Sequence, residues 1–276
     1  MRTGRAAKRL GVLNNHTRLS AARPGESAAA MTSSSSTPRA TSGDVGNEPA
    51  GERERGQGGG KRPARILCLH GYENSAPILR KQLDMSGWLR ELPDCEFVFA
   101  NAPFSSELPV SPIVQQFFPD DPKCQWFEKI EHLDSGVRYR GLSRGLDHVA
   151  ATLSDQGPFD GIIGFSQGSA LSLYTIAKQQ HGELSVRGGH PPLQFAIIIA
   201  GFRPRDVDHH HLFGAPLTVP TLHIWGTHDV LKHKSEEVTK NCVSPVVMTH
   251  KAGHKVPNMK TLDVAKIRQF IQTNTH

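Results

Sequence analysis

The pentapeptide Gly-Phe-Ser-Gln-Gly at residues 164–168 constrains the fold of this chain more than any other feature. It ends an apolar run at residues 159–165 and precedes a helix-forming run at residues 169–177. A G-x-S-x-G motif between a strand and a helix is typical of a nucleophile elbow, a sharp turn that exposes the serine hydroxyl. The motif therefore predicts that Ser166 is a nucleophile. The competing interpretation is that Ser166 only caps the following helix.

An acid and a histidine follow Ser166 in the chain order that such an elbow requires. Asp229 comes after an apolar strand expected at residues 221–225, and His254 lies in a loop between a short strand and the last amphipathic helix. We expect His254 to act as general base toward Ser166 and then as general acid toward the leaving group. Asp229 is expected to orient the imidazole and stabilise its charged form.

Other residues compete for two of these roles. His250 is an alternative base, although the glycine directly before His254 suits a tight turn that projects the His254 ring. Asp206 and Asp208 follow another expected strand and are alternative acids. We prefer Asp229 because it stands at the carboxyl end of its strand.

A site for acyl transfer also needs two backbone N–H groups that face the oxyanion, each worth about 3 kcal/mol. Gln167, the residue after the nucleophile, is expected to supply one of them. The other is expected from the loop after the first long strand, residues 65–70, and we assign it to the amide of Tyr72. His70 is expected to pack or hydrogen-bond within this loop without touching substrate.

Strand-like and helix-like segments alternate after residue 62, which predicts one α/β domain over residues 63–276, with a mostly parallel sheet and crossover helices. Expected strands cover residues 65–70, 95–100, 160–165, 194–200, 220–225 and 245–248. Expected helices cover residues 138–153, 167–180, 235–241 and 259–272.

Five segments together resemble one known family. They are His-Gly-Tyr at 70–72, Arg-Lys-Gln at 80–82, the elbow, Trp-Gly-Thr-His-Asp at 225–229 and Gly-His-Lys-Val-Pro at 253–257. The chain is similar, from residue 65 onward, to the small serine hydrolases named after yeast family-of-serine-hydrolases 1, whose human member is the ovarian-cancer-associated protein 2 esterase. The resemblance implies an α/β-hydrolase fold, cleavage of carboxylic esters without a cofactor, and a triad of Ser166, Asp229 and His254.

The resemblance leaves the substrate open. Residues 181–190 and the histidine run at 209–211 depart from the family pattern. An apolar, proline-broken stretch at residues 103–118, followed by Trp126, lies where this fold usually inserts lids and acyl pockets. The stretch either lines a pocket for a hydrophobic acyl chain or packs its phenylalanines and Trp126 onto the core. We expect a small-molecule ester with a hydrophobic acyl group of undetermined length.

All excess positive charge lies before the expected domain. Residues 1–62 hold 11 Lys/Arg and 5 Asp/Glu, whereas the rest of the chain holds 21 of each. The net charge of +6 therefore does not indicate that the domain binds nucleic acid. Residues 1–62 lack hydrophobic periodicity and are rich in Ser, Ala, Gly and Arg, which predicts a disordered tail.

The first 25 residues hold six basic residues and no acidic one, a composition typical of organellar transit peptides. A plain solvated tail, or synthesis that starts at Met31, is the alternative. No apolar run is long enough for a signal peptide or a membrane span. We expect a cytoplasmic protein, with a nuclear share by family resemblance. The alternative location is a mitochondrion or plastid.

Neither a metal nor a cofactor is expected. Cys68, Cys95, Cys124 and Cys242 show no metal-binding spacing and are expected to be reduced packing residues. The best metal candidate is the segment at residues 206–211, Asp-Val-Asp-His-His-His. Consecutive histidines point in different directions, however, and rarely complete one tetrahedral site.

Two other functions compete with the esterase. An acyl-protein or lysophospholipid thioesterase has the same elbow sequence, although the loop at residues 70–74 is less like theirs. A non-catalytic receptor for a small ligand, built on a hydrolase fold, is the alternative of another class, since binders retain triads. The sequence does not indicate the oligomeric state.

Overall fold

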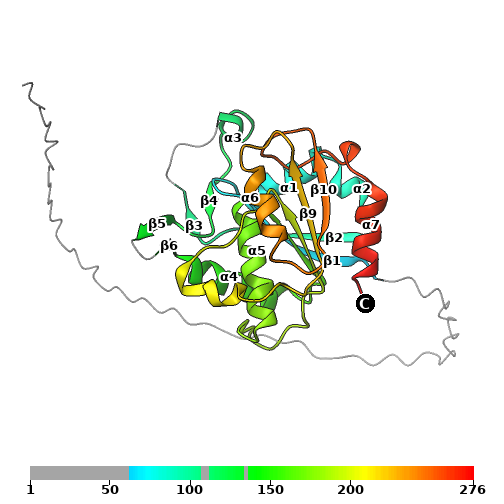
Figure 1. Ribbon diagram of the computed structural model, residues 1–276. Coiled ribbons are helices and arrows are strands. Elements are labelled where there is room, and N and C mark those ends of the chain that lie inside the picture. Colours follow the sequence, from blue (N-terminus) through cyan, green and yellow to red (C-terminus); the bar gives the residue numbers. More distant parts are fainter. Residues whose placement is uncertain (1–61, 107–111, 134–135) are drawn as a thin grey trace, which may run out of the picture. The chain divides into compact units, whose positions relative to one another are not determined.

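The computed structural model describes residues 62–106, 112–133 and 136–276 (Figure 1). Contacts between residues divide the chain into two units, Met1–Gln57 and Gly58–His276, and the described residues belong to the second. The predicted tail, the transit peptide and the alternative start at Met31 therefore lie outside the described residues, except for Arg62. Within the described ranges, no helix is long and apolar enough to cross a membrane.

A parallel sheet of six strands forms the centre of the second unit, in the order β10-β9-β8-β7-β1-β2. Its strands are β1 (Ala64–Leu69), β2 (Cys95–Ala100), β7 (Gly161–Phe165), β8 (Phe195–Ile199), β9 (Thr221–Gly226) and β10 (Val246–His250). All six correspond to the expected strands. Because β7 lies between β1 and β8 in the middle of the sheet, the residue that follows it stands near the centre of the carboxyl edge.

Helices cover both faces of this sheet (Figure 1). One face carries α4 (Leu142–Gln156), α5 (Gln167–Gln180), η1 (Val207–Phe213) and α6 (Lys232–Thr239). The other carries α1 (Ala76–Met85), α2 (Trp88–Glu91), η2 (Met259–Thr261) and α7 (Val264–Thr273).

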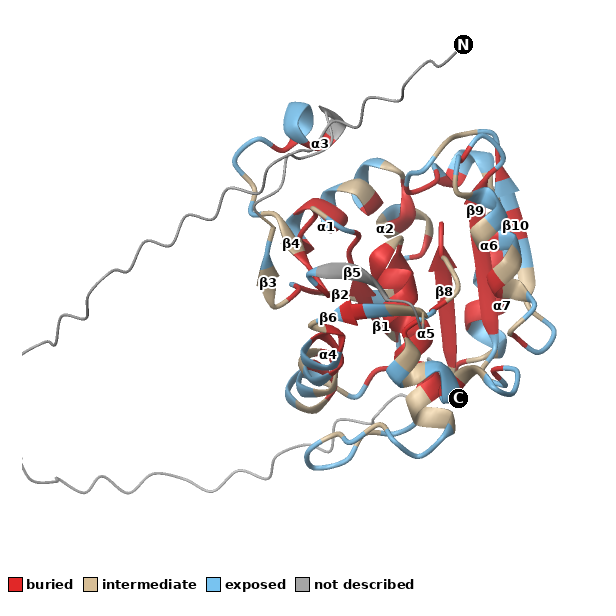
Figure 2. Cartoon of the chain, turned by 60° about the vertical axis from the view of Figure 1, so that its left-hand side comes forward, coloured by how far each residue is buried: buried red, intermediate tan, exposed pale blue. Residues whose placement is uncertain are grey.

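Alternate strand residues supply two separate cores. Leu67 and Ile162 face the first set of helices, whereas Ile66 and Ile163 face the second. Figure 2 shows that β8 and β9 are buried along their lengths, as expected for parallel strands covered on both faces.

One helix begins later than predicted. The expected helix at residues 138–153 overlaps the last three residues of β6 (Gly136–Arg140), which pairs antiparallel with β5 (Lys129–Leu133). Gly141, at φ 82°, then turns the chain into α4. A left-handed residue at this position favours glycine, and it separates the hairpin from the helix. The helical pattern in the sequence therefore corresponds to a helix only after Gly141.

Two further helices differ in their ends. The helix expected at residues 235–241 is α6, which begins three residues earlier and ends two residues earlier than expected. The helix expected at residues 259–272 is divided into η2 and α7. Asp263 explains the division because its carboxylate accepts a hydrogen bond of 3.1 Å from the backbone N–H of Lys266 and so caps a new helix.

The segment between β2 and α4, here called the insertion, consists of short elements outside the six-stranded sheet. It contains β3 (Phe104–Ser105), α3 (Pro112–Phe117), β4 (Cys124–Gln125) and the β5–β6 hairpin. Phe118 is buried against Ile78, and Trp126 belongs to the core under α4 and α5. Packing is therefore the role of these two aromatic residues, whereas Phe117 is 55% exposed.

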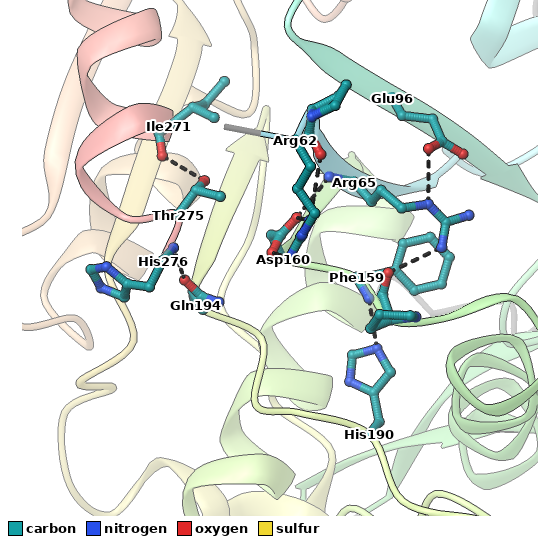
Figure 3. A network of polar contacts seen from close by, with 12 residues as sticks. Arg62, Arg65, Glu96, Phe159, Asp160, His190, Gln194, Ile271, Thr275 and His276 are labelled. Atoms are coloured by element: carbon teal, nitrogen blue, oxygen red, sulfur yellow. Dashed lines mark hydrogen bonds and ion pairs between the residues drawn. The ribbon is translucent and has the colours of Figure 1, made fainter. Parts of the chain in front are cut away.

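Polar contacts around Asp160 close the amino edge of the sheet (Figure 3). Its buried carboxylate accepts two hydrogen bonds of 2.7 Å from the Arg62 guanidinium and one of 2.8 Å from the backbone N–H of Arg65. Burial raises the pKa of Asp160, but these donors outweigh it and hold that pKa below its usual range. A cavity of about 510 Å³ opens beside this network and is lined by Arg62, Cys95, Arg268 and residues near the end of α7.

Candidate active site

Ser166 lies between β7 and α5 in a conformation that serine rarely adopts, with φ 52° and ψ −110°. Its side chain makes no capping hydrogen bond to α5, so the interpretation as a helix cap is wrong. The flanking glycines permit the turn. A Cβ at Gly164 would lie 2.4 Å from the carbonyl oxygen of Gly168, and one at Gly168 would lie 2.2 Å from that of Leu69. The elbow therefore presents the Ser166 hydroxyl at the carboxyl edge of the sheet.

His254 joins Ser166 to Asp229. The Ser166 hydroxyl lies 2.9 Å from Nε2 of His254, and Nδ1 of the same ring lies 2.7 Å from Oδ2 of Asp229. The Asp229 side chain has no solvent exposure, and its Oδ1 accepts a hydrogen bond of 2.8 Å from the backbone N–H of Leu231. A buried carboxylate beside Nδ1 keeps the proton on that nitrogen, which leaves Nε2 able to accept a proton from the serine.

Two neighbouring loops hold the His254 segment. A Cβ at Gly226, the last residue of β9, would lie 1.9 Å from the carbonyl oxygen of Ala252, so the loops after β9 and β10 are in direct contact. On the other side of His254 in the chain, the carbonyl oxygen of Pro257 accepts a hydrogen bond of 2.9 Å from the indole N–H of Trp88, in α2. The imidazole is therefore positioned from both ends of its loop.

The competing base and acids lie elsewhere. Nδ1 of His250 accepts a backbone N–H within its own loop, and the ring is buried. Asp206 accepts backbone N–H groups of β6 and η1, and Asp208 forms an ion pair of 3.0 Å with Arg138. In the described part of the chain, none of the three forms a hydrogen bond with the serine of the elbow.

The sequence matches a family model described as "Serine hydrolase (FSH1)" over residues 61–265. The chain belongs to this serine hydrolase family. The matched residues include the elbow, Asp229 and His254, and relatives of the chain carry the name esterase. The protein is therefore an enzyme, as the sequence resemblance predicted.

Relatives and solved structures agree with the family. Esterase OVCA2 of Xenopus tropicalis is 32% identical over 212 residues, which cover 71% of this serine hydrolase and 87% of the relative. A dihydrofolate reductase of Schizosaccharomyces pombe is 27% identical over 232 residues, which cover 76% of this chain but 47% of that longer protein. Acyl-protein thioesterase 2 of Zea mays superposes with a TM-score of 0.52 at 23% identity, covering 78% of this chain and 95% of that one. This likeness confirms the predicted α/β-hydrolase fold.

The loop that carries Tyr72 packs against the elbow of this serine hydrolase. A Cβ at Gly71 would lie 2.9 Å from the Phe165 ring, and one at Gly168 would lie 2.6 Å from the carbonyl oxygen of His70. Gln167 is the first residue of α5. Among the described residues, no acceptor takes a hydrogen bond from the backbone N–H of Tyr72 or of Gln167. Both amides remain candidates for the oxyanion hole.

The His70 ring fixes this loop from beneath, as expected from its place in the turn. Its Nδ1–H donates to the carbonyl oxygen of Gly71 at 2.7 Å, and its Nε2 accepts the backbone N–H of Ala102 at 3.0 Å. Its own carbonyl oxygen accepts the Trp126 indole N–H at 2.8 Å. Burial lowers the pKa of His70 to about 4, so the ring is neutral near pH 7 and keeps this pair of roles.

The side chain of Gln167 has a role that the sequence analysis missed. Its Oε1 accepts the backbone N–H of Trp126 at 2.7 Å, and its Nε2 donates to the carbonyl oxygen of Phe127 at 3.2 Å. The residue next to the nucleophile thus clamps the insertion to the elbow. A long polar side chain at the start of the largely apolar α5 was the only signal of this contact in the sequence.

The histidine run serves local contacts. His209 pairs with Asp206 at 2.9 Å and His211 with Glu183 at 3.1 Å. Across the described ranges, no group of three or more His, Cys, Asp or Glu side chains is arranged to hold a metal ion. The four cysteines are unpaired and buried or half-buried, and burial raises the pKa of Cys95 to about 11.

Proposed function

We propose that this protein hydrolyses carboxylic esters through an acyl-enzyme formed on Ser166. The observation that carries the proposal is the line of hydrogen bonds from Asp229 through His254 to Ser166, at 2.7 and 2.9 Å. As the Ser166 oxygen attacks the ester carbonyl, Nε2 of His254 takes its proton and then gives it to the alcohol oxygen as the C–O bond breaks. Water repeats these steps on the acyl-enzyme and releases the carboxylic acid.

Two further features assist each step. The buried carboxylate of Asp229 keeps the imidazole oriented and stabilises its positive charge while the proton is held. The backbone N–H groups of Tyr72 and Gln167 would donate to the negative oxygen of the tetrahedral intermediate, and such a donor is worth about 3 kcal/mol. The positive end of α5 adds to the stabilisation at Gln167.

A hydrophobic acyl group is the substrate class that the exposed side chains of this edge favour. Tyr72 lies in the loop after β1 and is 37% exposed, and Val230 directly follows Asp229 and is 83% exposed. Exposed apolar side chains at the rim of a site favour contact with an apolar ligand. The acyl length is to be measured.

The proposal is tested with p-nitrophenyl esters of increasing acyl length. The wild-type protein is expected to turn over these esters, and Ser166→Ala is expected to lose at least a thousandfold in kcat while its circular dichroism is unchanged. Ser172→Ala removes a buried hydroxyl from α5, the helix that follows Ser166, and serves as the matched control. Equal rates for wild type and Ser166→Ala would contradict the mechanism.

The same triad chemistry would cleave a thioester, and the superposed maize protein is an acyl-protein thioesterase. A palmitoyl-thioester peptide is therefore included in the series. Faster cleavage of this peptide than of any oxygen ester would favour the thioesterase. Binding of a ligand without turnover would support the receptor function. Membership of a serine hydrolase family argues against that function.

A further inference from the structure

A small basic pocket lies beside the candidate active site, between the loop after β8 and the first turns of α6. Its volume is about 70 Å³. Its lining contains one aromatic side chain, Phe202, one acidic side chain, Glu237, and four basic side chains, namely Arg203, Arg205, His233 and Lys234. Over residues 63–276 as a whole, the number of Lys and Arg residues equals the number of Asp and Glu residues. The basic residues are therefore concentrated here by placement rather than by an overall excess.

Most of this positive charge is not compensated within the protein. Arg203 forms an ion pair of 3.5 Å with Glu237, which is the single acid of the pocket. In the portion of the chain that the structure describes, Arg205, His233 and Lys234 have no ion-pair partner. The pocket thus presents cations that have no acidic partner among the described residues.

The start of α6 adds to the unfavourable electrostatics. Its first three residues, at 232–234, are Lys-His-Lys, with no acidic residue in the first turn and no side-chain cap. The amino end of a helix carries a partial positive charge and is stabilised by anions, so cations there cost stability. A sequence that breaks this rule without a compensating contact in the protein is expected at a functional site.

Backbone contacts place the pocket close to the triad. The backbone N–H of Ser166 donates at 2.9 Å to the carbonyl oxygen of Ile199, and Arg203 follows Ile199 by four residues. Four residues of chain span at most about 14 Å. His233 follows Asp229 by the same interval. The Ser235 hydroxyl donates at 2.7 Å to the carbonyl oxygen of Gly201 and so ties the two walls together.

We propose that this pocket binds an anionic oxygen group, a carboxylate or a phosphate, on the ester that Ser166 cleaves. The proposal rests on the proposed function and specifies its substrate. The substrate then has an apolar part at the rim and a charged group whose distance from the scissile carbonyl is set by these four-residue spans, each at most about 14 Å along the backbone. Arginine supplies paired donors for such a group.

Two pairs of esters test the proposal, because the charge can lie on either side of the scissile bond. In the first pair, p-nitrophenyl esters of dicarboxylic acids of increasing length are compared with the same compounds as terminal methyl esters. In the second, 3-carboxy-4-nitrophenyl butyrate is compared with p-nitrophenyl butyrate. In at least one pair, the anionic compound is expected to have a kcat/KM at least tenfold higher.

The preference is expected to disappear in the double variant Arg205→Ala/Lys234→Ala, through KM, while cleavage of the neutral ester is retained. Lys240→Ala removes a cation from the other end of α6 and is the matched control, expected to keep the preference. The absence of a preference in both pairs, or its persistence in the double variant, would overturn the proposal.

A binding measurement separates this proposal from the esterase mechanism. Ser166→Ala is titrated with inorganic phosphate and with succinate, and amide shifts of residues 201–203, 205 and 232–237 are followed by NMR. Saturable shifts that vanish in the triple variant with Arg205→Ala/Lys234→Ala support the pocket even if no ester is cleaved. The absence of saturable shifts overturns it even if neutral esters are cleaved.

Discussion

Oδ2 of Asp229 and Nδ1 of His254 are 2.7 Å apart, although α6 and β10 lie between the two residues in the chain. The carboxylate is fully buried and is also held by the Leu231 backbone N–H, so it has no freedom to turn away. This contact gives the imidazole one orientation.

Asp229→Asn is expected to lower kcat about 10³–10⁴-fold, because an amide in place of the carboxylate favours the wrong imidazole tautomer. The fold should be retained since the amide oxygen can still accept the Leu231 N–H. Steady-state kinetics and thermal unfolding check this. Asp208→Asn, at an exposed alternative acid, is the control, and an equal loss there would contradict the assignment.

His254→Ala and His250→Ala should separate the two candidate bases. The first is expected to lose at least a thousandfold in kcat because no other ring is hydrogen-bonded to Ser166 in the described residues. The second is expected to keep kcat within a few-fold, because His250 contacts its own loop. Rates with p-nitrophenyl esters decide between them, and the opposite pattern would exchange the roles.

His70→Ala is expected to lower kcat by roughly tenfold to a hundredfold, less than the loss of an oxyanion donor itself, with little change in KM. The reason is that the ring ties Gly71 to Ala102 and so fixes the loop that offers the Tyr72 amide. A kcat-against-KM comparison over several esters checks it. A loss confined to KM, or a loss that only follows unfolding, would show that the ring does not act on the transition state.

Acid is expected to destabilise this enzyme through two buried histidines. Burial lowers the pKa of His70 and of His223 to about 4. The unfolded chain therefore binds protons at these rings below pH 6.5, whereas the folded chain does not. Stability is complete above about pH 6.5 and falls by roughly 3 kcal/mol per ring as the pH approaches 4. Urea unfolding at several pH values measures the slope.

His223→Leu should remove one of these two contributions. Neither ring nitrogen of His223 has a hydrogen-bond partner in the described residues, so an apolar side chain of similar size costs nothing there and lowers the acid sensitivity. The variant is expected to be at least as stable as wild type at pH 7 and more stable at pH 5. An unchanged pH slope would contradict the role given to His223.

The parts of this site that local sequence could predict are those that depend on neighbours in the chain. The elbow glycines, the order of the three triad residues and the six strands follow from short patterns. The contact of Gln167 with Trp126 could not be predicted, because it joins residues 41 positions apart. The β6 strand was hidden by the amphipathic pattern that continues into α4, and only the left-handed Gly141 separates them.

The hydrogen bonds from Gln167 to Trp126 and Phe127 divide the insertion after β2 into two parts with different freedom to vary. Residues at the clamp cannot change their backbone path without disturbing the turn that carries Ser166. The described residues before β4, which include the exposed Phe117, take no part in these two hydrogen bonds. Substitutions in that part can therefore change the surface of the insertion while both hydrogen bonds to the elbow are kept.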